Sequence, residues 1–391
     1  MAVFPYSIGV ANISDIHFRD NWAERLYREL RENFLDVLEL NIENIHLINI
    51  LGDLFHQKLL MTGQGAYYCS KFIQDLIDIA HGIPIRIIVG TRTHDYNQPK
   101  IFRYLPSSAN LKIYDKPVIE KFSFFEKEDF AALYIPEEYP ANWKDYYRDF
   151  LIDNEYTYDA IFMHGMVDFM AHPSLVLESE DIIQSSVVFP VQVFKENAVV
   201  AVGGHVHVAE SCENFYYCGS FSRWCYGEEK PKGWIFLEYD IDKRKYKIEF
   251  AENDLAPEYK TIKLSSVYKS GDKIEKSLDK ISRYIITNKI KNLRIKCDLE
   301  NSEETVQALS VLREHYSQDD NYNVSIFQPS KKSTKNETPI EETEIDKKES
   351  EIAYSQKPIE EKIQEWITLK HDKDVPLQLI RETIGNSKIT N

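Results

Sequence analysis

The feature that most constrains this chain is a series of short apolar runs, each followed closely by an aspartate or a histidine. The runs cover residues 4–13, 45–51, 85–89, 159–163 and 198–202. Their length and composition are typical of buried strands. The motifs that follow them are Asp15-x-His17, Gly52-Asp53, His94-Asp95, His164-Gly165 and His205-x-His207. Polar groups at the strand ends of an open α/β sheet converge on one crevice, so we expect these side chains to share a site.

The chemistry of these motifs indicates metal binding. Because strand side chains alternate between faces, Asp15 and His17 are predicted to project the same way, as are His205 and His207. Carboxylates and imidazoles that face one another suit manganese, iron or zinc. Any one of these histidines could be an ordinary buried residue. That interpretation does not explain why they repeatedly follow predicted strands.

The order of the predicted elements favours an α/β fold. In the first half, strands alternate with amphipathic helices at residues 26–38 and 66–80, which implies a mostly parallel sheet with right-handed crossovers. Later strands are predicted at 118–122, 130–135, 159–163, 198–203, 215–219, 234–239 and 246–250. Their short connections fit a second, mixed sheet stacked on the first.

Longer motifs carry a family resemblance. They are Ser14-Asp15-Ile16-His17, Gly52-Asp53-Leu54-Phe55-His56, Gly204-His205-Val206-His207, and the run from Tyr217 through Arg223 and Tyr226-Gly227-Glu228-Glu229 to Lys232-Gly233. Over residues 1–250 the chain resembles the calcineurin-like metallophosphoesterases, and within them the SbcD-type subunit of double-strand-break repair nucleases. The resemblance implies a four-layer α/β/β/α metallophosphoesterase sandwich.

The resemblance also implies a role for each site residue around two divalent metal ions, with Mn²⁺ the expected metal. Asp53 would bridge the two ions. Asp15, His17 and His207 would complete the ligands of the first ion, and His164 and His205 would bind the second. His94 would protonate the leaving group or stabilise the transition state, while His56 would help to position the phosphate.

One motif departs from the family, which reads Gly-Asn-His-Asp where this chain reads Gly90-Thr91-Arg92-Thr93-His94-Asp95. Thr93 therefore occupies the position of the metal-binding Asn, and a hydroxyl is a poorer ligand than an amide carbonyl. Asn97 is the nearest amide that could replace it. Arg92 could instead contact the phosphate, because its planar guanidinium pairs well with phosphate oxygens.

The domain organisation is predicted partly by resemblance. Residues 1–256 would form the nuclease domain, and residues 257–328 a small α+β capping domain that guides DNA. Residues 329–356 are too polar to fold, which indicates a disordered linker. The apolar pattern returns in residues 357–391, predicted to be a tethered helical tail. The tail either docks on its own chain or binds a partner, and by resemblance that partner is an SbcC-like ATPase.

Composition restricts the location and the mode of DNA binding. A net charge of −16 argues against tight DNA binding by the chain alone, because phosphate contacts need Lys and Arg. The five cysteines include no CxxC pair, so we expect a reducing compartment, and Cys212, Cys218 and Cys225 are interpreted as incidental rather than as a zinc site. The sequence predicts no signal peptide, no membrane span and a cytoplasmic location.

Three functions fit these observations. The leading hypothesis is a DNA exonuclease and endonuclease, a dinuclear-metal phosphodiesterase that serves as the catalytic subunit of an SbcCD-like repair complex. A small-molecule phosphodiesterase or phosphatase of the same superfamily is the second, and a non-catalytic scaffold that binds DNA ends is the third. The resemblance further implies a homodimer, for which residues 26–40 and 66–80 are candidate surfaces.

Overall fold

The structure is a computed structural model. It describes residues 7–105, 110–125, 128–137, 147–151, 157–170, 188–269, 274–288, 292–299, 302–316, 323–327 and 364. The predicted linker lies outside the described residues, as does the predicted tail apart from Gln364. Among the described helices, none combines the length and the apolar composition that a membrane span requires.

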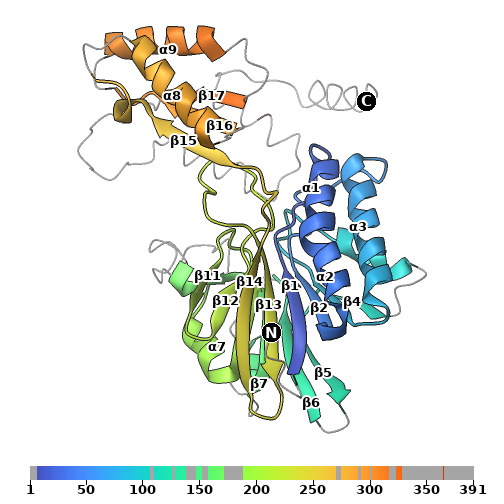
Figure 1. The fold of residues 1–391 in the computed structure, drawn as a ribbon. Helices are drawn as coiled ribbons and strands as arrows, with labels where there is room; N and C mark the ends of the chain where they lie inside the picture. Colours follow the sequence, from blue (N-terminus) through green and yellow to red (C-terminus); the bar gives the residue numbers. More distant parts are fainter. Residues whose placement is uncertain are drawn as a thin grey trace. The chain divides into compact units, whose positions relative to one another are not determined.

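The first sheet has six strands in the order β14-β13-β1-β2-β3-β4 (Figure 1). The bounds are β1 Ser7–Ile13, β2 Leu47–Leu51, β3 Ile85–Ile88, β4 Leu111–Tyr114, β13 Gly233–Asp240 and β14 Lys245–Glu252. Strands β1 to β4 are parallel, as predicted for the first three, whereas β13 runs antiparallel to both of its neighbours, β1 and β14. The carboxyl ends of β1, β2 and β3 therefore lie at one edge of this sheet.

The second sheet also has six strands, in the order β11-β12-β10-β7-β6-β5. The bounds are β5 Val118–Phe125, β6 Glu128–Ile135, β7 Tyr158–His164, β10 Ala198–Gly204, β11 Glu210–Cys212 and β12 Phe215–Tyr217. Its central strands are parallel, and Gly204 at the end of β10 lies beside His164 at the end of β7. The register thus brings His164 and His205 to the same level. A separate two-stranded ribbon pairs β8 (Met166–Val167) with β9 (Val188–Phe189).

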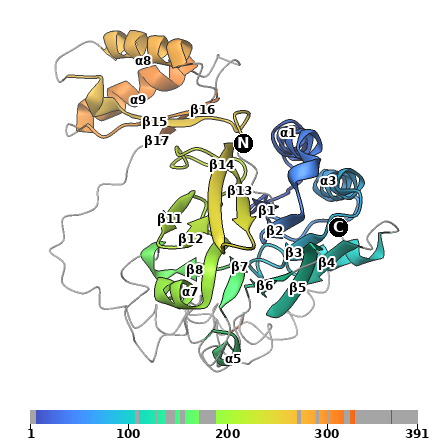
Figure 2. The same cartoon turned by 60° about the horizontal axis from the view of Figure 1, so that its bottom comes forward.

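Helices cover the outer faces of both sheets. On the first sheet these are α1 (Ala23–Leu30), the π-helical turn η1 (Arg31–Leu35), α2 (Asp36–Leu40) and α3 (Gln64–Ala80), with α1 and α3 side by side (Figures 1 and 2). On the second sheet they are α5 (Arg148–Leu151) and α7 (Val191–Asn197). Short 3₁₀ turns are η2 (Ile42–Asn44), η3 (Gln98–Tyr104), η5 (Asp168–Met170) and η6 (Leu264–Ser266).

Three apolar clusters separate the four layers. Helix residues such as Leu26 and Phe72 pack with Ile50 under the first sheet. Side chains from both sheets, including Leu51 and Phe162, fill the space between them. A third cluster joins the second sheet to α5 and α7. The predicted α/β class with α/β/β/α layers is therefore confirmed.

A third sheet has a hydrophobic core of its own. Its parallel strands are β15 (Tyr259–Lys263), β16 (Asn292–Lys296) and β17 (Asn323–Phe327), with helices α8 (Ile274–Asn288) and α9 (Ser302–Tyr316). Buried Ile281, Leu293 and Leu312 belong to this core. The strands and helices expected for residues 257–328 are thus present, while the DNA-guiding role of this unit stays a prediction.

Candidate metal centre

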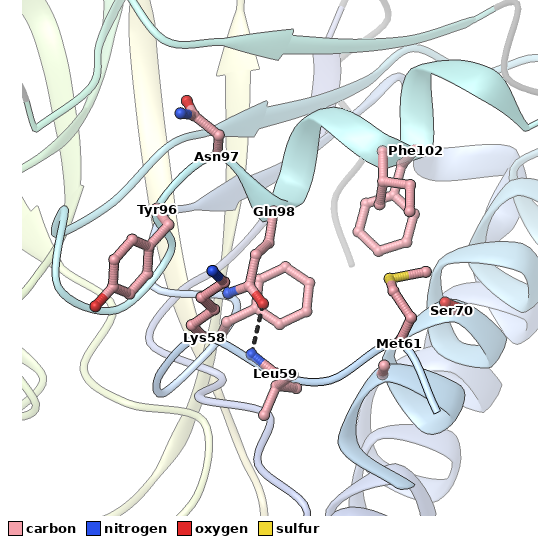
Figure 3. Close-up of a pocket in the computed structure, with 11 residues that line it drawn as sticks. Lys58, Leu59, Met61, Ser70, Tyr96, Asn97, Gln98 and Phe102 are labelled. Carbon is pink, nitrogen blue, oxygen red and sulfur yellow. Dashed lines mark hydrogen bonds between the residues drawn. The ribbon is translucent and has the colours of Figure 1, made fainter. Parts of the chain in front are cut away.

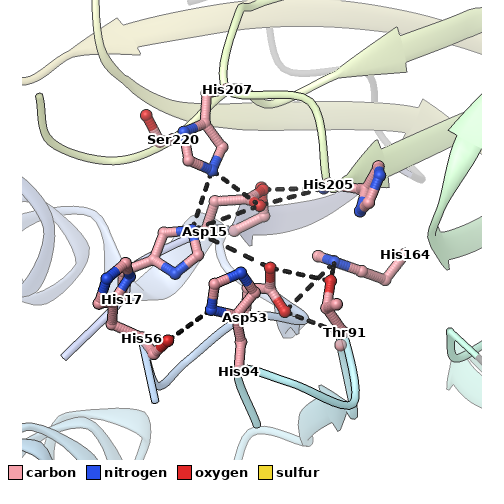
Figure 4. Close-up of polar contacts among 12 residues, drawn as sticks. Asp15, His17, Asp53, His56, Thr91, His94, His164, His205, His207 and Ser220 are labelled. Carbon is pink, nitrogen blue, oxygen red and sulfur yellow. Dashed lines mark hydrogen bonds and ion pairs between the residues drawn. The ribbon is translucent and has the colours of Figure 1, made fainter. Parts of the chain in front are cut away.

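The loops after several strands bring a set of imidazoles and carboxylates together (Figure 4). Within each of several groups, the potential ligand atoms lie within 4.8 Å of one another. The groups are Asp15, His17 and His207; Glu137, His164 and His205; Asp15, Asp53 and His164; and His17, His56 and His94. The histidines and aspartates predicted to bind metal are all among them.

The first ligand set centres on two imidazoles. The Nε2 atoms of His17 and His207 are 2.9 Å apart, and each lies just under 4 Å from Asp15 Oδ1, at 3.9 and 3.8 Å. The Nδ1 atom of His17 is buried, and no hydrogen-bond partner for it exists among the described residues. Two nitrogens that converge beside a carboxylate are arranged as ligands of one ion.

The second ligand set contains a residue that the sequence analysis missed. Glu137 Oε2 lies 3.3 Å from His164 Nε2 and 3.2 Å from His205 Nδ1. The only signal in the sequence was position, because Glu137 follows the strand-like run 130–135 just as the other site residues follow theirs. It belongs to no recognisable motif, since Ile135-Pro136-Glu137 resembles many surface loops.

Asp53 lies between the two sets and presents a different oxygen to each. Its Oδ2 is 4.0 Å from His17 Nε2, and its Oδ1 is 3.5 Å from His164 Nε2. The carboxylate is almost fully buried. This position fits the bridging role that the resemblance predicts for Asp53.

The backbone, rather than strand alternation, aims several of these side chains. Asp15, His17 and Asp53 have φ angles of 50°, 57° and 49°, and His205 has a φ of 93°. These left-handed conformations are uncommon for residues other than glycine and indicate local strain. Asp15 and His17 belong to the same group, as predicted, but strand pleating is the wrong reason, because β1 ends at Ile13 and both residues lie in the loop that follows.

Glycines leave room for the ligands. A Cβ atom at Gly52, where φ is +84°, would lie 2.2 Å from His164 Nδ1. At Gly90 a Cβ atom would lie 2.4 Å from Asp53 Oδ1. Neither position tolerates a side chain without moving a ligand.

Hydrogen bonds outside the two sets orient the imidazoles. The Nδ1 atom of His164 donates to the Leu51 carbonyl at 2.7 Å, which leaves Nε2 to face Asp53 and Glu137. His207 Nδ1 lies 2.8 Å from Glu228 Oε1, in the carboxylate–histidine arrangement that orients metal ligands. In both residues Nδ1 is occupied by this hydrogen bond, so Nε2 is the ring nitrogen that faces the other candidate ligands.

Asp95 serves the loops rather than the metal sets. Its fully buried carboxylate accepts hydrogen bonds from the Phe55 amide at 2.9 Å and from the Gly90 amide at 2.8 Å. Burial, followed by the charge of Asp53, raises the pKa of Asp95. The residue therefore joins the loop after β2 to the loop after β3.

His56 and His94 form a half-buried pair beside the first set, with ring centroids 5.4 Å apart. His94 Nδ1 donates to the His56 carbonyl, so a proton delivered by His94 would come from its Nε2 atom. The ring of His94 is 4.9 Å from that of His17. Burial and then the charge of Arg19 lower the pKa of His56.

The electrostatics keep the Glu137 carboxylate ionised. Burial acts to raise the pKa of Glu137, but hydrogen bonds and charges from His164 and His205 lower it to about 2. Burial likewise opposes protonation of His164, yet Asp53 and Glu137 outweigh it and raise the pKa of His164 well above its usual value. For His17, burial dominates and lowers the pKa well below 6.5. Anionic oxygens thus face imidazoles throughout the site.

In the altered motif, the observed contact with a candidate ligand comes from a threonine that was not predicted. Thr91, rather than Thr93, contacts the site, with its Oγ1 3.1 Å from Asp53 Oδ2. Arg92 and Thr93 are exposed. Asn97 is exposed and lines a pocket of about 480 Å³ together with Lys58, Tyr96 and other residues (Figure 3).

Other candidates are not part of the described centre. His46 accepts a hydrogen bond from the Gly9 amide at 3.1 Å, which is a structural contact between the start of the first sheet and the segment before β2. His172 lies outside the described residues. Cys212, Cys218 and Cys225 are described, and none joins a group of metal-binding side chains in that part of the chain.

No protein-family model and no curated protein sequence matches this chain. Among solved structures, it is similar to GAP50, the anchor in the inner membrane complex of Plasmodium. That similarity has 14% identity and a TM-score of 0.41, and covers 64% of this chain and 85% of the other. It is also similar to a predicted phosphoesterase from Streptococcus pneumoniae TIGR4, with 13% identity, a TM-score of 0.30, and coverage of 63% and 91%. Similarities this distant assign no function to this chain.

Proposed function

We propose that this chain is a metal-dependent phosphodiesterase that cleaves DNA, the catalytic subunit of an SbcCD-like repair complex. The observation that carries the proposal is the position of Asp53, which presents one oxygen to each of two buried ligand sets. A dinuclear phosphoesterase requires this arrangement, since a shared carboxylate joins the two ions.

The donor set fits divalent metal ions. The close approach of His17 Nε2 to His207 Nε2 would be unfavourable unless a proton or a cation were shared between the two nitrogens. Carboxylates mixed with imidazoles suit manganese, iron or zinc, of which we expect Mn²⁺. Asp15, His17, His207 and Asp53 would hold one ion, and Asp53, His164 and His205 the other. When bound, such ions lower the pKa of a water and stabilise charge on a phosphate.

The pair His56 and His94 supplies proton transfer. His94 is held by its Nδ1 hydrogen bond to the His56 carbonyl, which fixes the ring relative to the first ligand set. A fixed imidazole with a free Nε2 can protonate the oxygen that leaves the phosphorus. His56 would stand beside the same phosphate.

Arg19 adds a phosphate contact that the sequence analysis did not identify. Its guanidinium lies 4.3 Å from the ring centroid of Trp22 and 4.7 Å from that of Trp224. The Nε and Nη2 atoms are buried and have no acceptor among the described residues. A planar cation held by two indoles suits a phosphodiester oxygen near His56, which the half-buried guanidinium would meet through the part that is not enclosed.

The choice of DNA over a small diester rests on the motif resemblance and on the two extra segments. The unit from Tyr259 to Phe327 and the predicted tail at residues 357–391 have little use in a small-substrate hydrolase. DNA, an SbcC-like ATPase that binds the tail, a homodimer and a cytoplasmic location complete the proposal. The net charge of −16 is the observation that favours the small-molecule alternative.

A substrate comparison tests this proposal. The full chain would be assayed with Mn²⁺ on end-labelled duplex and hairpin DNA and on a chromogenic phosphodiester, with Asp53→Ala and a chelator as controls. We expect DNA cleavage that both controls abolish. Preference for the chromogenic diester by orders of magnitude would replace the proposal with the small-molecule function. Cleavage of neither substrate would favour the scaffold.

A further inference from the structure

The second ligand set holds a carboxylate where the motif resemblance expects an amide. Glu137 Oε2 faces both His164 Nε2 and His205 Nδ1. We propose that Glu137 binds the second metal ion directly and takes the place of the missing Asn, with Thr91 linking it to Asp53. This inference rests on the metal centre of the proposed function.

The distances fit shared coordination. Donors that bond one ion at ~2.0–2.2 Å lie about 3.0–3.5 Å from one another. Glu137 Oε2 meets this condition with both imidazole nitrogens, at 3.3 and 3.2 Å. Its side chain is only 2% exposed, so the carboxylate is enclosed with these partners rather than solvated.

The fold fixes Glu137 at this point. The Glu137 amide donates to the carbonyl of Val89, just beyond the end of β3, at 3.2 Å. The end of β6 is thus joined to the loop that carries Thr91. The Thr91 hydroxyl lies 2.7 Å from Glu137 Oε2 and 3.1 Å from Asp53 Oδ2, and donates its one proton to one of them. Thr91 therefore positions both carboxylates.

An ordinary ion pair explains this arrangement less well. Among the described residues, the cationic partners of Glu137 are imidazoles and not Lys or Arg. One protonated imidazole would be enough to balance the charge of the carboxylate, whereas two ring nitrogens converge on the same Oε2 atom. A divalent ion would satisfy the carboxylate and both nitrogens together.

The substitution has a chemical consequence. A carboxylate in place of a neutral amide adds one negative charge beside the second ion, so the ion is held more strongly. Carboxylate oxygen also favours ions such as Mn²⁺ and Mg²⁺. The loss of the Asn ligand at Thr93 is therefore compensated from another strand, and the site stays dinuclear.

Counting metal ions tests the assignment without any nuclease assay. The metal-free full chain would be titrated with Mn²⁺ and followed by electron paramagnetic resonance and native mass spectrometry. We expect two exchange-coupled ions in the wild type. In Glu137→Ala and Glu137→Gln we expect the affinity for the second ion to fall at least tenfold, while the first ion remains and gives an uncoupled signal.

Thr93→Ala is the matched control, because it alters the position aligned with the family Asn but lies exposed on the same loop. It should retain two coupled ions. Two coupled ions of wild-type affinity in both Glu137 variants would overturn the assignment, as would equal loss of both ions in the isosteric Glu137→Gln. Absence of Mn²⁺ from the wild type would overturn the metal centre itself. A wild type that binds two ions but cuts no DNA would refute the proposed function and leave the role of Glu137 intact.

Discussion

At the scale of single residues, the site depends on conformations and close contacts that permit little substitution. Asp15, His17 and Asp53 occupy left-handed backbone regions, and Gly52 leaves space that a methyl group would take from His164. Such strain persists only where the surrounding structure holds it, here through Asp95 and the strand ends.

Gly52→Ala tests this requirement. The variant must adopt a φ of +84° and place a Cβ atom 2.2 Å from His164 Nδ1. We expect the free energy of unfolding to fall by more than the ~1–3 kcal/mol that the backbone alone costs. Gly227→Ala is the matched control, because Gly227 has a φ of +105° but its Cβ atom would meet nothing within 4 Å. Equal urea midpoints for the two variants would contradict the steric argument.

Arg19→Ala tests the phosphate contact. A hydrogen bond to a charged group contributes ~1.5–3 kcal/mol, so we expect KM for DNA to rise at least about tenfold. Metal content should not change. The slope of the logarithm of the DNA-binding constant against the logarithm of the salt concentration should decrease by about one, which corresponds to one phosphate contact. The control is Arg28→Ala, which removes the same charge from an exposed position on α1. An identical effect of both substitutions on KM would show that net charge, and not Arg19 itself, is responsible.

At the scale of elements, an ion pair joins the two sheets away from the metal centre. Glu120 on β5 accepts from Arg86 on β3, at 2.6 Å from Nε and 2.7 Å from Nη2. Arg86 is almost fully buried and also donates to the carbonyls of Ile85 and Asn110. The pair therefore helps to set the spacing of the layers that carry the ligand loops.

Glu120→Gln leaves the Arg86 charge buried without its partner, which costs about 3–5 kcal/mol of unfolding free energy. Burial acts to raise the pKa of Glu120, but hydrogen bonds from Arg86 and Lys112 outweigh it and lower the pKa below 4.5. Because the folded pKa is depressed, the stabilisation is present above 4.5 and is lost as pH falls through the folded value. Urea titrations from neutral to acidic pH should show that the difference in unfolding free energy between wild type and variant becomes smaller below pH 4.5. A difference that does not change with pH would contradict this account.

Sequence patterns predicted the long elements well and the short ones poorly. Periodicity indicated one helix over residues 26–38. The structure divides this segment into α1, a π-helical turn and α2. The sequence did not show the division, because the apolar residues keep the same spacing throughout. Strand β4 was missed, since Leu111–Tyr114 is too short to show alternation. The histidines and aspartates of the motifs were predicted and lie together, whereas Glu137 was not predicted, because only the folded chain brings it to them.

At the scale of the whole molecule, the hydrophobic clusters of the described residues lie between Ile8 and Ile326, and Gln364 is the one residue of the predicted tail that the structure describes. This bears on the two interpretations of residues 357–391, as a helix docked on its own chain or as a partner-binding segment.

Removal of residues 330–391 distinguishes these interpretations. If the tail binds a partner, the shortened chain should keep its unfolding free energy and its two metal ions, and should lose association with an SbcC-like ATPase. Thermal unfolding, metal analysis and co-purification provide the measurements. A loss of more than about 1 kcal/mol of stability would instead show that the tail packs on its own chain, since surface changes rarely exceed ±0.5 kcal/mol.

The most direct test of the dinuclear centre is anomalous diffraction at the manganese absorption edge, from crystals of the full chain grown with Mn²⁺. We predict two peaks about 3.5–4 Å apart with Asp53 between them. One peak should lie against Asp15, His17 and His207, and the other against Glu137, His164 and His205. A single peak, or none, at saturating Mn²⁺ would contradict the account.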